Sequence, residues 1–256
     1  MWFDTHVNLH HERFDEDRDD VVSRARKAGV TGMVEICQDE RQFETVQAIS
    51  KRFGLPHTVG THPHYAKDVT DRTVEDLLAL ASLPDVVGIG ETGLDFHYGY
   101  SDEVSQRANF ARHIAVARET QKVLVIHSRN ADEMMADMLH AAIAEGAFPL
   151  LLHCFTAGQT LADMVLELGG YISFSGILTF KNAHDVRAAA MRVPKERILI
   201  ETDCPYLTPV PERGQRCEPR HVALVGAALA ELRGWDLNAC AETTSANARR
   251  CFGLES

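Results

Sequence analysis

The side chains of this chain that are best suited to chemistry stand where short apolar segments end. His6 lies in WFDTHV, Glu91 ends VVGIGE, His127 ends VLVIH, and Asp203 directly follows ILIET, while His153 lies in a fifth such segment. Imidazole and carboxylate together form the mixed nitrogen and oxygen ligand set of divalent metal ions. If these segments are parallel strands, their carboxyl ends meet on one face, and the five side chains predict a divalent-metal site.

The joint pattern carries more weight than any of its members. A single histidine at a strand end is more often a structural residue than a ligand. A carboxylate as deeply set in apolar sequence as Glu91 is costly unless it is paired or binds a metal. Because separate segments each supply an imidazole or a carboxylate to the same end, the metal site is the favoured interpretation.

The elements that must position these residues alternate along the chain. Eight apolar segments are nearly continuous, as expected of strands that are buried on both faces. Amphipathic stretches with helix start and stop signals lie between or after them. The predicted strands cover 2–7, 31–37, 57–60, 86–91, 123–127, 151–155, 171–176 and 198–202, and the predicted helices cover 15–28, 102–120, 131–145, 158–168, 183–192, 219–232 and 236–250. This order predicts one domain over residues 1–256 that folds as an α/β (β/α)8 TIM barrel. An open doubly wound sheet is the alternative, because periodicity cannot detect closure.

Composition narrows the classes of function. The 256 residues include 26 basic and 37 acidic ones, and the formal net charge of −11 argues against a wide electrostatic footprint for duplex DNA. It does not exclude a small site at which metal ions meet one or two phosphates. No apolar run reaches the roughly 18 residues that span a membrane, the start MWFDTHVNLH lacks the features of a secretory signal, and nothing points to an obligate protein partner. Six scattered cysteines without a CxxC pair favour reduced thiols and a cytoplasmic location.

Six ordered motifs make the chain similar to a known family. They are DTHVNL at 4–9, GTHPH at 60–64, GIGETGLDFHY at 88–98, HSRNA at 127–131, HCFTAG at 153–158, and ETDCPYL at 201–207 followed by RGQRCEP at 213–219. The sequence resembles the TatD family of metal-dependent deoxyribonucleases, which belongs to the amidohydrolase-like barrel group. The resemblance covers essentially the whole chain. It implies a (β/α)8 barrel, two divalent ions (Mg²⁺, Mn²⁺, Zn²⁺ or Co²⁺), and hydrolysis of phosphodiester bonds from the 3′ end of single-stranded DNA.

The resemblance also assigns roles to individual residues. His6 and Asp203 would hold the first metal, Glu91 would bridge it to the second, and His127 and His153 would complete the second site. Glu91 and Asp203 would be the catalytic residues, with Asp203 orienting the attacking water or accepting its proton. The expected contacts to substrate are His62, His64 and Arg129. A guanidinium suits phosphate oxygens because its fork of donors matches them.

Two positions depart from the family pattern. Asn8 stands where a second histidine is expected after His6, and it offers a carbonyl oxygen that suits Mg²⁺ or Mn²⁺ better than Zn²⁺. Asn8 is therefore kept as a metal ligand of a weaker first site. Cys217 stands where the family has asparagine.

Other functions stay open at this stage. A metallohydrolase of the same barrel group could act on a non-nucleic ester, lactone, amide or aminoacyl bond, and Asn8 and the lack of a basic stripe favour it. A non-catalytic binding protein is the third possibility, but a decaying site need not retain five costly polar residues.

Several residues near the motifs admit ordinary structural roles. Glu201 could orient a ligand histidine or simply be a buried hydrogen-bonding group. Tyr98 and Tyr100 could stack on bases or pack within their loop. Strand alternation predicts that Cys154 points away from the site into the core. Cys204 is likewise expected in the core, whereas the loop histidines His10 and His11 are expected in solvent.

Overall fold

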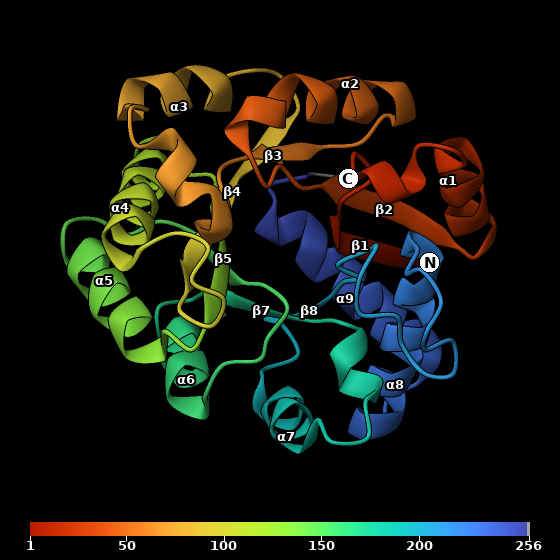
Figure 1. Ribbon diagram of the computed structural model, residues 1–256. Coiled ribbons are helices and arrows are strands. Elements are labelled where there is room, and N and C mark those ends of the chain that lie inside the picture. Colours follow the sequence, from red (N-terminus) through yellow and green to blue (C-terminus); the bar gives the residue numbers. More distant parts are fainter. Residues whose placement is uncertain (255–256) are drawn as a thin grey trace.

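The computed structural model describes residues 1–254, and it forms a closed (β/α)8 barrel (Figure 1). Eight parallel strands follow one another around the barrel in chain order. They are β1 (Trp2–Val7), β2 (Val30–Glu35), β3 (His57–Val59), β4 (Val86–Asp95), β5 (Val123–Arg129), β6 (Leu150–Leu152), β7 (Tyr171–Phe174) and β8 (Ile198–Ile200). The structure confirms the predicted barrel over the open-sheet alternative.

Closure of the barrel depends on contacts between the two ends of the chain. A parallel bridge joins Val7 to Cys204, and the backbone N–H of Asp203 donates to the carbonyl oxygen of His6 at 3.1 Å. The buried carboxylate of Asp4 accepts hydrogen bonds from the backbone and hydroxyl of Thr202 at 2.9 and 2.6 Å. These contacts bring the first and last strands together and so complete the ring.

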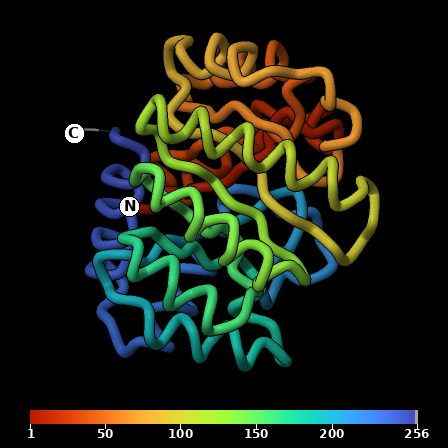
Figure 2. Tube along the Cα trace, turned by 90° about the vertical axis from the view of Figure 1, so that its left-hand side faces the viewer, coloured from red at the N-terminus to blue at the C-terminus, as the bar shows by residue number. Residues whose placement is uncertain are grey.

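Helices surround the strands on the outside, and the side view in Figure 2 shows the N-terminus and the end of the last helix on the same side. They are α1 (Arg18–Lys27), α2 (Phe43–Phe53), α3 (Val74–Ala81), α4 (Glu103–Thr120), α5 (Asp132–Ala144), α6 (Gln159–Glu167), α7 (His184–Arg192), α8 (Val222–Arg233) and α9 (Leu237–Cys251). Short 3-10 segments include η1 (Glu12–Phe14), η2 (Glu40–Gln42), η3 (Pro63–Val69), η4 (Gly176–Thr179) and η5 (Pro219–His221). Within residues 1–254, none of the helices is long and apolar enough to cross a membrane.

The sequence analysis did not predict α2 and α3, although both carry clear end signals. Helix α3 starts with a capping box between Thr73 and Asp76, and α2 ends at Gly54 in the left-handed conformation. Each of the other seven helices begins and ends within three residues of a predicted stretch, and the segment η5 occupies the predicted start of α8.

Apolar side chains inside the barrel form a floor beneath the strand ends. Val125, Leu151 and Leu199 belong to one buried cluster. Each lies two residues before a candidate site residue on the same chain segment, so it faces the same side one pleat lower. The polar residues at the strand ends therefore rest on packed apolar side chains, which hold their positions and keep water from beneath them.

Candidate metal centre

Glu91 lies at the centre of a ring of imidazoles at the mouth of the barrel. Its side chain is only 2% exposed. One carboxylate oxygen, Oε1, lies 2.8 Å from Nε2 of His153, 3.3 Å from Nδ1 of His127 and 3.3 Å from Nε2 of His62. The other oxygen, Oε2, lies 3.4 Å from Nε2 of His6. The two oxygens therefore face two different sets of nitrogen donors, as a carboxylate that bridges two cations must.

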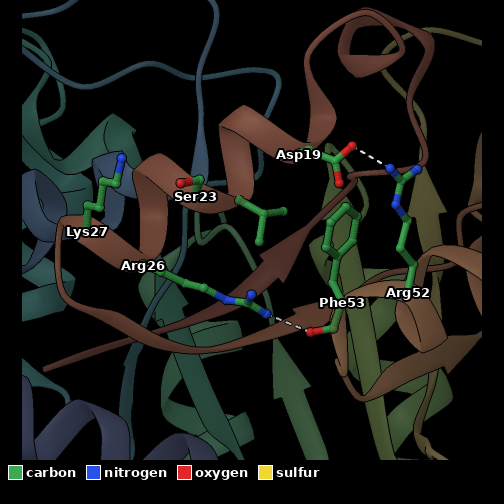
Figure 3. A pocket seen from close by; sticks show the side chains of 7 residues that line it. Asp19, Ser23, Arg26, Lys27, Arg52 and Phe53 are labelled. Carbon is green, nitrogen blue, oxygen red and sulfur yellow. Dashed lines mark hydrogen bonds and ion pairs between the residues drawn. The ribbon is translucent and has the colours of Figure 1, made fainter.

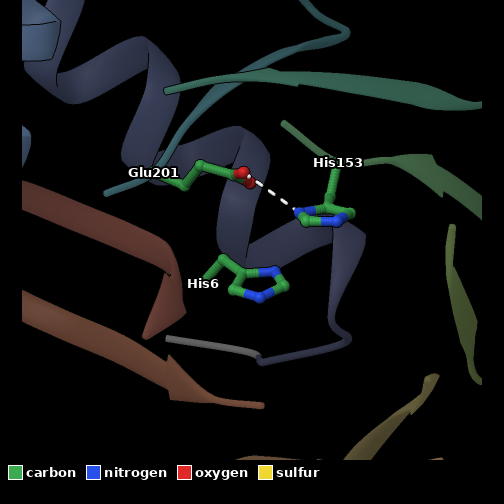
Figure 4. A group of neighbouring side chains, drawn as sticks. All are labelled: His6, His153 and Glu201. Carbon is green, nitrogen blue, oxygen red and sulfur yellow. Dashed lines mark hydrogen bonds and ion pairs between the residues drawn. The ribbon is translucent and has the colours of Figure 1, made fainter. Parts of the chain in front are cut away.

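The separations between donors suit a metal ion. Two donors that bind one ion at about 2.1 Å lie about 3.0 to 3.4 Å from each other. Within the described part of the chain, two groups of three residues bring their donor atoms within 4.8 Å of one another: His6, His153 and Glu201, and His62, Glu91 and His127. Figure 4 shows the first group, in which the rings of His6 and His153 stack with centroids 4.2 Å apart.

Several buried polar atoms of the site have no hydrogen-bond partner among the described residues. They are both ring nitrogens of His6, one carboxylate oxygen of Glu201 and the amide oxygen of Asn8. A buried polar atom without a partner is costly. A cation at the mouth would satisfy one ring nitrogen of His6 and the two oxygens, so the donor set fits a divalent metal.

Asp203 approaches the same ring nitrogen of His6 as Glu91 does. It follows β8 with a positive φ of 54°, and its Oδ1 lies 3.6 Å from Nε2 of His6. Asn8 donates from Nδ2 to the carbonyl oxygen of Cys204 at 2.9 Å and to Oδ1 of Asp203 at 3.4 Å. The NH2 group of Asn8 is therefore occupied by these two hydrogen bonds, and its amide oxygen is left as a free acceptor.

The charges of the site are set by its burial and by its pairs. Burial favours the neutral carboxyl of Glu91, but the imidazoles of His153 and His62 outweigh it and hold the pKa well below its usual range. Burial opposes a charge on His153, yet the carboxylates of Glu91 and Glu201 raise its pKa well above the usual value. Burial raises the pKa of Asp203 to about 6. Glu91 is therefore an anion at neutral pH, whereas the pKa of Asp203 lies close to neutral pH.

Two buried carboxylates orient the candidate ligand histidines, each by contacting the ring nitrogen that does not face Glu91. Oε1 of Glu201 lies 3.1 Å from Nδ1 of His153, which leaves Nε2 of that ring facing Glu91. Asp95 lies 3.1 Å from Nε2 of His127, which leaves Nδ1 facing Glu91. Such partners fix the ring orientation and the position of its proton. Glu201 thus has the orienting geometry that the sequence analysis left open.

Asp95 and Gln38 are site residues that the sequence analysis missed. Asp95 ends β4, so the strand-end signal that singled out Glu91 applies to it as well. Its carboxylate is fully buried and also lies 2.9 Å from Nε2 of His64. Gln38 donates from Nε2 to Oε2 of Glu91 at 3.0 Å. An amide in the loop after β2 carries no signal in the sequence that would have distinguished it.

A glycine permits the close approach of β4 and β5 at this level. Gly93 pairs with His127 in the sheet register and has a φ of 137°. A Cβ atom there would lie only 2.0 Å from the carbonyl oxygen of His127. Any side chain at this position would push β5 outward and move His127 away from Glu91.

The three residues predicted to contact substrate occupy different depths. His62 is nearly buried beside Glu91, and burial lowers its pKa to about 4, so its ring is neutral at neutral pH. His64 lies nearer the surface against Asp95. Arg129, at the end of β5, places its guanidinium 4.7 Å from the centre of the Tyr98 ring. The structure thus brings His62 into the metal centre, whereas Arg129 stands at the rim.

The structure corrects the prediction for Cys154. Its side chain is only partly buried, and its thiol lies 3.2 Å from the hydroxyl of Ser175. Burial and the nearby carboxylate of Asp203 raise the pKa of the thiol well above its usual value, so the side chain lies beside the site and does not point away from it. Strand alternation fails because β6 ends at Leu152 and Cys154 has a φ of 43°.

The prediction that His10 lies in solvent is also wrong. Its side chain is 6% exposed and its Nδ1 lies 2.8 Å from Oε1 of the fully buried Glu35. His11 is partly exposed, with Nε2 2.9 Å from the hydroxyl of Tyr206. Cys204 is fully buried, as predicted.

Cys217, where the family has asparagine, is also fully buried, with its sulfur 4.0 Å from the carbonyl oxygen of Thr202. This thiol therefore packs inside the β8 loop and adds no exposed amide there.

A separate hollow of about 640 Å³ lies outside the barrel between α1 and α2 (Figure 3). Its arginines already have partners, since Arg26 donates to the carbonyl oxygen of Phe53 and Arg52 pairs with Asp19. The hollow has no cluster of metal-ligating side chains comparable to that at the mouth.

Comparison with known proteins agrees with this geometry. The model of the family described as TatD related DNase matches residues 3–253. The chain is 36% identical over 255 residues to the uncharacterized metal-dependent hydrolase YabD of Bacillus subtilis, covering 99% of this chain and 100% of the relative. The chain belongs to the TatD family. It is therefore a metal-dependent hydrolase.

Another TatD family relative carries a more specific name. The protein from Citrobacter koseri named 3′-5′ ssDNA/RNA exonuclease TatD is 36% identical over 261 residues, covering 98% of this chain and 99% of the relative. Among solved structures, the TatD homologue YJJV of Escherichia coli superposes with a TM-score of 0.89 at 24% identity, covering 99% and 98% of the two chains. At that identity the likeness shows the fold.

Proposed function

We propose that this TatD family protein is a two-metal 3′→5′ exonuclease that hydrolyses phosphodiester bonds at the ends of single-stranded DNA. The observation that carries the proposal is the position of Glu91, whose Oε1 faces the imidazoles of His127 and His153 while its Oε2 faces the imidazole of His6. The name of the Citrobacter koseri relative supports the substrate class.

The residues that would hold the two ions divide around Glu91. His6, Asp203 and the amide oxygen of Asn8 would bind the first ion, and His127 and His153 the second. When bound, two divalent ions lower the pKa of water and offset the negative charge of a phosphate. They would also explain how a protein with a net charge of −11 accepts an anionic substrate.

The protein's own groups supply orientation and proton transfer. Asp203 is 16% exposed at the mouth, so its carboxylate can reach the attacking water and orient it or accept its proton. The neutral ring of His62 accepts the His64 backbone N–H at Nδ1 and turns its Nε2–H toward Glu91, so it would help to hold that carboxylate in place. Arg129 at the rim would pair with a neighbouring phosphate.

Release of mononucleotides from the 3′ end is the direct test. A 5′-labelled single-stranded oligonucleotide should shorten progressively with Mg²⁺, Mn²⁺, Co²⁺ or Zn²⁺, and chelation with EDTA should stop the reaction. A 3′-labelled duplex of the same sequence should react slowly. An oligonucleotide that stays intact with every metal would refute the proposal.

A hydrolase for a non-nucleic ester, lactone, amide or aminoacyl bond is the second candidate. The free amide oxygen of Asn8 and the acidic balance of the chain favour it. Parallel assays on phosphoesters and carboxylic esters separate the two, because cleavage of an ester beside an intact oligonucleotide would establish this alternative. We propose a cytoplasmic location for either activity, which the six free thiols support.

A further inference from the structure

Two exposed tyrosines form a stacked pair at the mouth of the barrel. Tyr98 and Tyr100 lie on the loop between β4 and α4 and are 48% and 56% exposed. Their ring centroids are 5.4 Å apart and the rings are within 12° of parallel. Rings that served only to pack the loop would be covered by it, whereas about half of each of these side chains is open to solvent.

The loop that carries the pair is held at both ends. The backbone N–H of Tyr98 donates to Oδ1 of Asp95 at 3.2 Å, and Gln106 donates from Nε2 to the carbonyl oxygen of Ser101 at 2.9 Å. The hydroxyl of Ser101 in turn donates to the carbonyl oxygen of His64 at 2.9 Å. The tyrosines are therefore ordered before any ligand arrives, which lowers the entropic cost of binding.

A continuous series of rings leads from the pair to the metal centre. The ring of His64 stands edge-on to Tyr98 and Tyr100, with centroids 5.3 and 4.8 Å away, and its centroid is 4.2 Å from that of His62. Only one imidazole thus separates the exposed pair from a ring that contacts Glu91. Asp95 fixes both features, since Oδ1 holds the Tyr98 backbone and Oδ2 lies against His64.

We propose that the Tyr98–Tyr100 pair is a nucleobase-binding subsite, on which a base next to the cleaved bond stacks while Arg129 meets the adjoining phosphate. This inference rests on the proposed nuclease function and specifies how the strand end is held. The pair offers π faces, and the guanidinium of Arg129 above Tyr98 adds a positive charge. Stacking accepts every base, so the subsite selects an unpaired strand without selecting its sequence.

The test compares substrates with and without a terminal base. For a single-stranded oligonucleotide, the double variant Tyr98→Ala/Tyr100→Ala should raise KM between about fivefold and about 150-fold, the range expected for loss of base–aromatic stacking. For the same oligonucleotide with an abasic 3′-terminal nucleotide, parent and variant should have the same KM. Tyr98→Ala/Tyr100→Ala is compared with Tyr100→Phe, which keeps the π face and the hydrogen bond from Arg129 to the Tyr98 hydroxyl and should behave like the parent.

A matched control uses Tyr65, an exposed tyrosine of the η3 segment that takes no part in the stack. Tyr65→Ala should leave KM within about twofold of the parent value, as expected of a surface substitution. An equal rise of KM in Tyr65→Ala, or an equal rise for the base-bearing and abasic substrates, would overturn the proposal.

A binding assay keeps the test independent of catalysis. An oligonucleotide with 2-aminopurine at its 3′ end and non-hydrolysable terminal linkages is titrated with the full-length protein in Mn²⁺, where quenching reports stacking of that base. Quenching in the parent that disappears only in Tyr98→Ala/Tyr100→Ala supports the subsite, even if no oligonucleotide is cleaved and the nuclease proposal fails. Absence of quenching in the parent overturns the subsite, whatever the outcome of the cleavage assay.

Discussion

Replacing Asp95 by asparagine would test how the metal centre is oriented. The buried carboxylate accepts four hydrogen bonds, two from the backbone N–H groups of His97 and Tyr98 and two from the rings of His64 and His127. An amide of the same shape has one accepting oxygen and one donating NH2 group. Neither orientation of the amide can satisfy all four donors.

The substitution should therefore move the proton on His127. With Asp95 present, the ring carries its proton on Nε2 and keeps the lone pair of Nδ1 for a cation. Opposite an NH2 group, the favoured tautomer carries the proton on Nδ1, which removes that lone pair from the site. Loss of an orienting partner typically weakens metal binding 10- to 100-fold, or about 1.4 to 2.8 kcal/mol.

The same structure predicts a loss of stability. Two charge-assisted hydrogen bonds contribute roughly 1.5 to 3 kcal/mol each, so Asp95→Asn should cost about 3 to 6 kcal/mol in total, divided between folding and metal binding. Isothermal titration with Mn²⁺ or Zn²⁺ measures the affinity, urea unfolding measures the stability, and nitrogen-15 NMR of the histidines reports the tautomer.

Glu35→Gln is the matched control for this experiment. Glu35 is equally buried and likewise pairs with a histidine, His10, but on a neighbouring loop. The control should lose a comparable amount of stability and keep its metal affinity within about threefold of the parent value, because its histidine is outside the ligand set. If Asp95→Asn retains both the parent affinity and the Nε2 tautomer of His127, the orienting argument is refuted.

Three further predictions concern single residues. Glu91→Gln should lower kcat by about a hundredfold or more, because both ions lose a shared anionic oxygen, and activity within about threefold of the parent would contradict the bridging role. Asn8→His should tighten the first metal site by about tenfold or more, and identical titration curves for the two proteins would rule this out. His113 is buried with Nε2 accepting from the Thr61 N–H at 2.9 Å, and burial lowers its pKa to about 4. The pKa of His113 in the folded protein lies below its unfolded value of about 6.5. The contribution of His113 to the free energy of unfolding is therefore complete above pH 6.5 and falls by about 2 kcal/mol by pH 5. Denaturant unfolding at pH 7.5 and 5 should therefore show a smaller loss in His113→Gln than in the parent, and equal losses would refute the assignment.

The sequence by itself determined the alternation of strands and helices and most of the candidate metal ligands. Continuously apolar segments alternating with amphipathic stretches specify strands buried beneath helices, because both patterns are local and repeat with the period of the backbone. The candidate donors His6, Glu91 and His127 were recognisable because polar residues at the ends of apolar strands are costly without a partner. Placement in the TatD family followed from the order of motifs and is confirmed by the matching family model.

Tertiary structure alone decided closure and the contacts that orient the donors. Periodicity along a strand says nothing of what lies beside it, so the joining of β1 to the β8 loop could not be read from the chain. Asp95 holds His127, and Gln38 holds Glu91. In each pair the two residues come from different strands or loops of the barrel. The side chain of Cys154 turned toward the site because its backbone leaves the strand with a positive φ. Contacts between segments distant in sequence depend on the closed fold, so a local pattern in the sequence does not predict them.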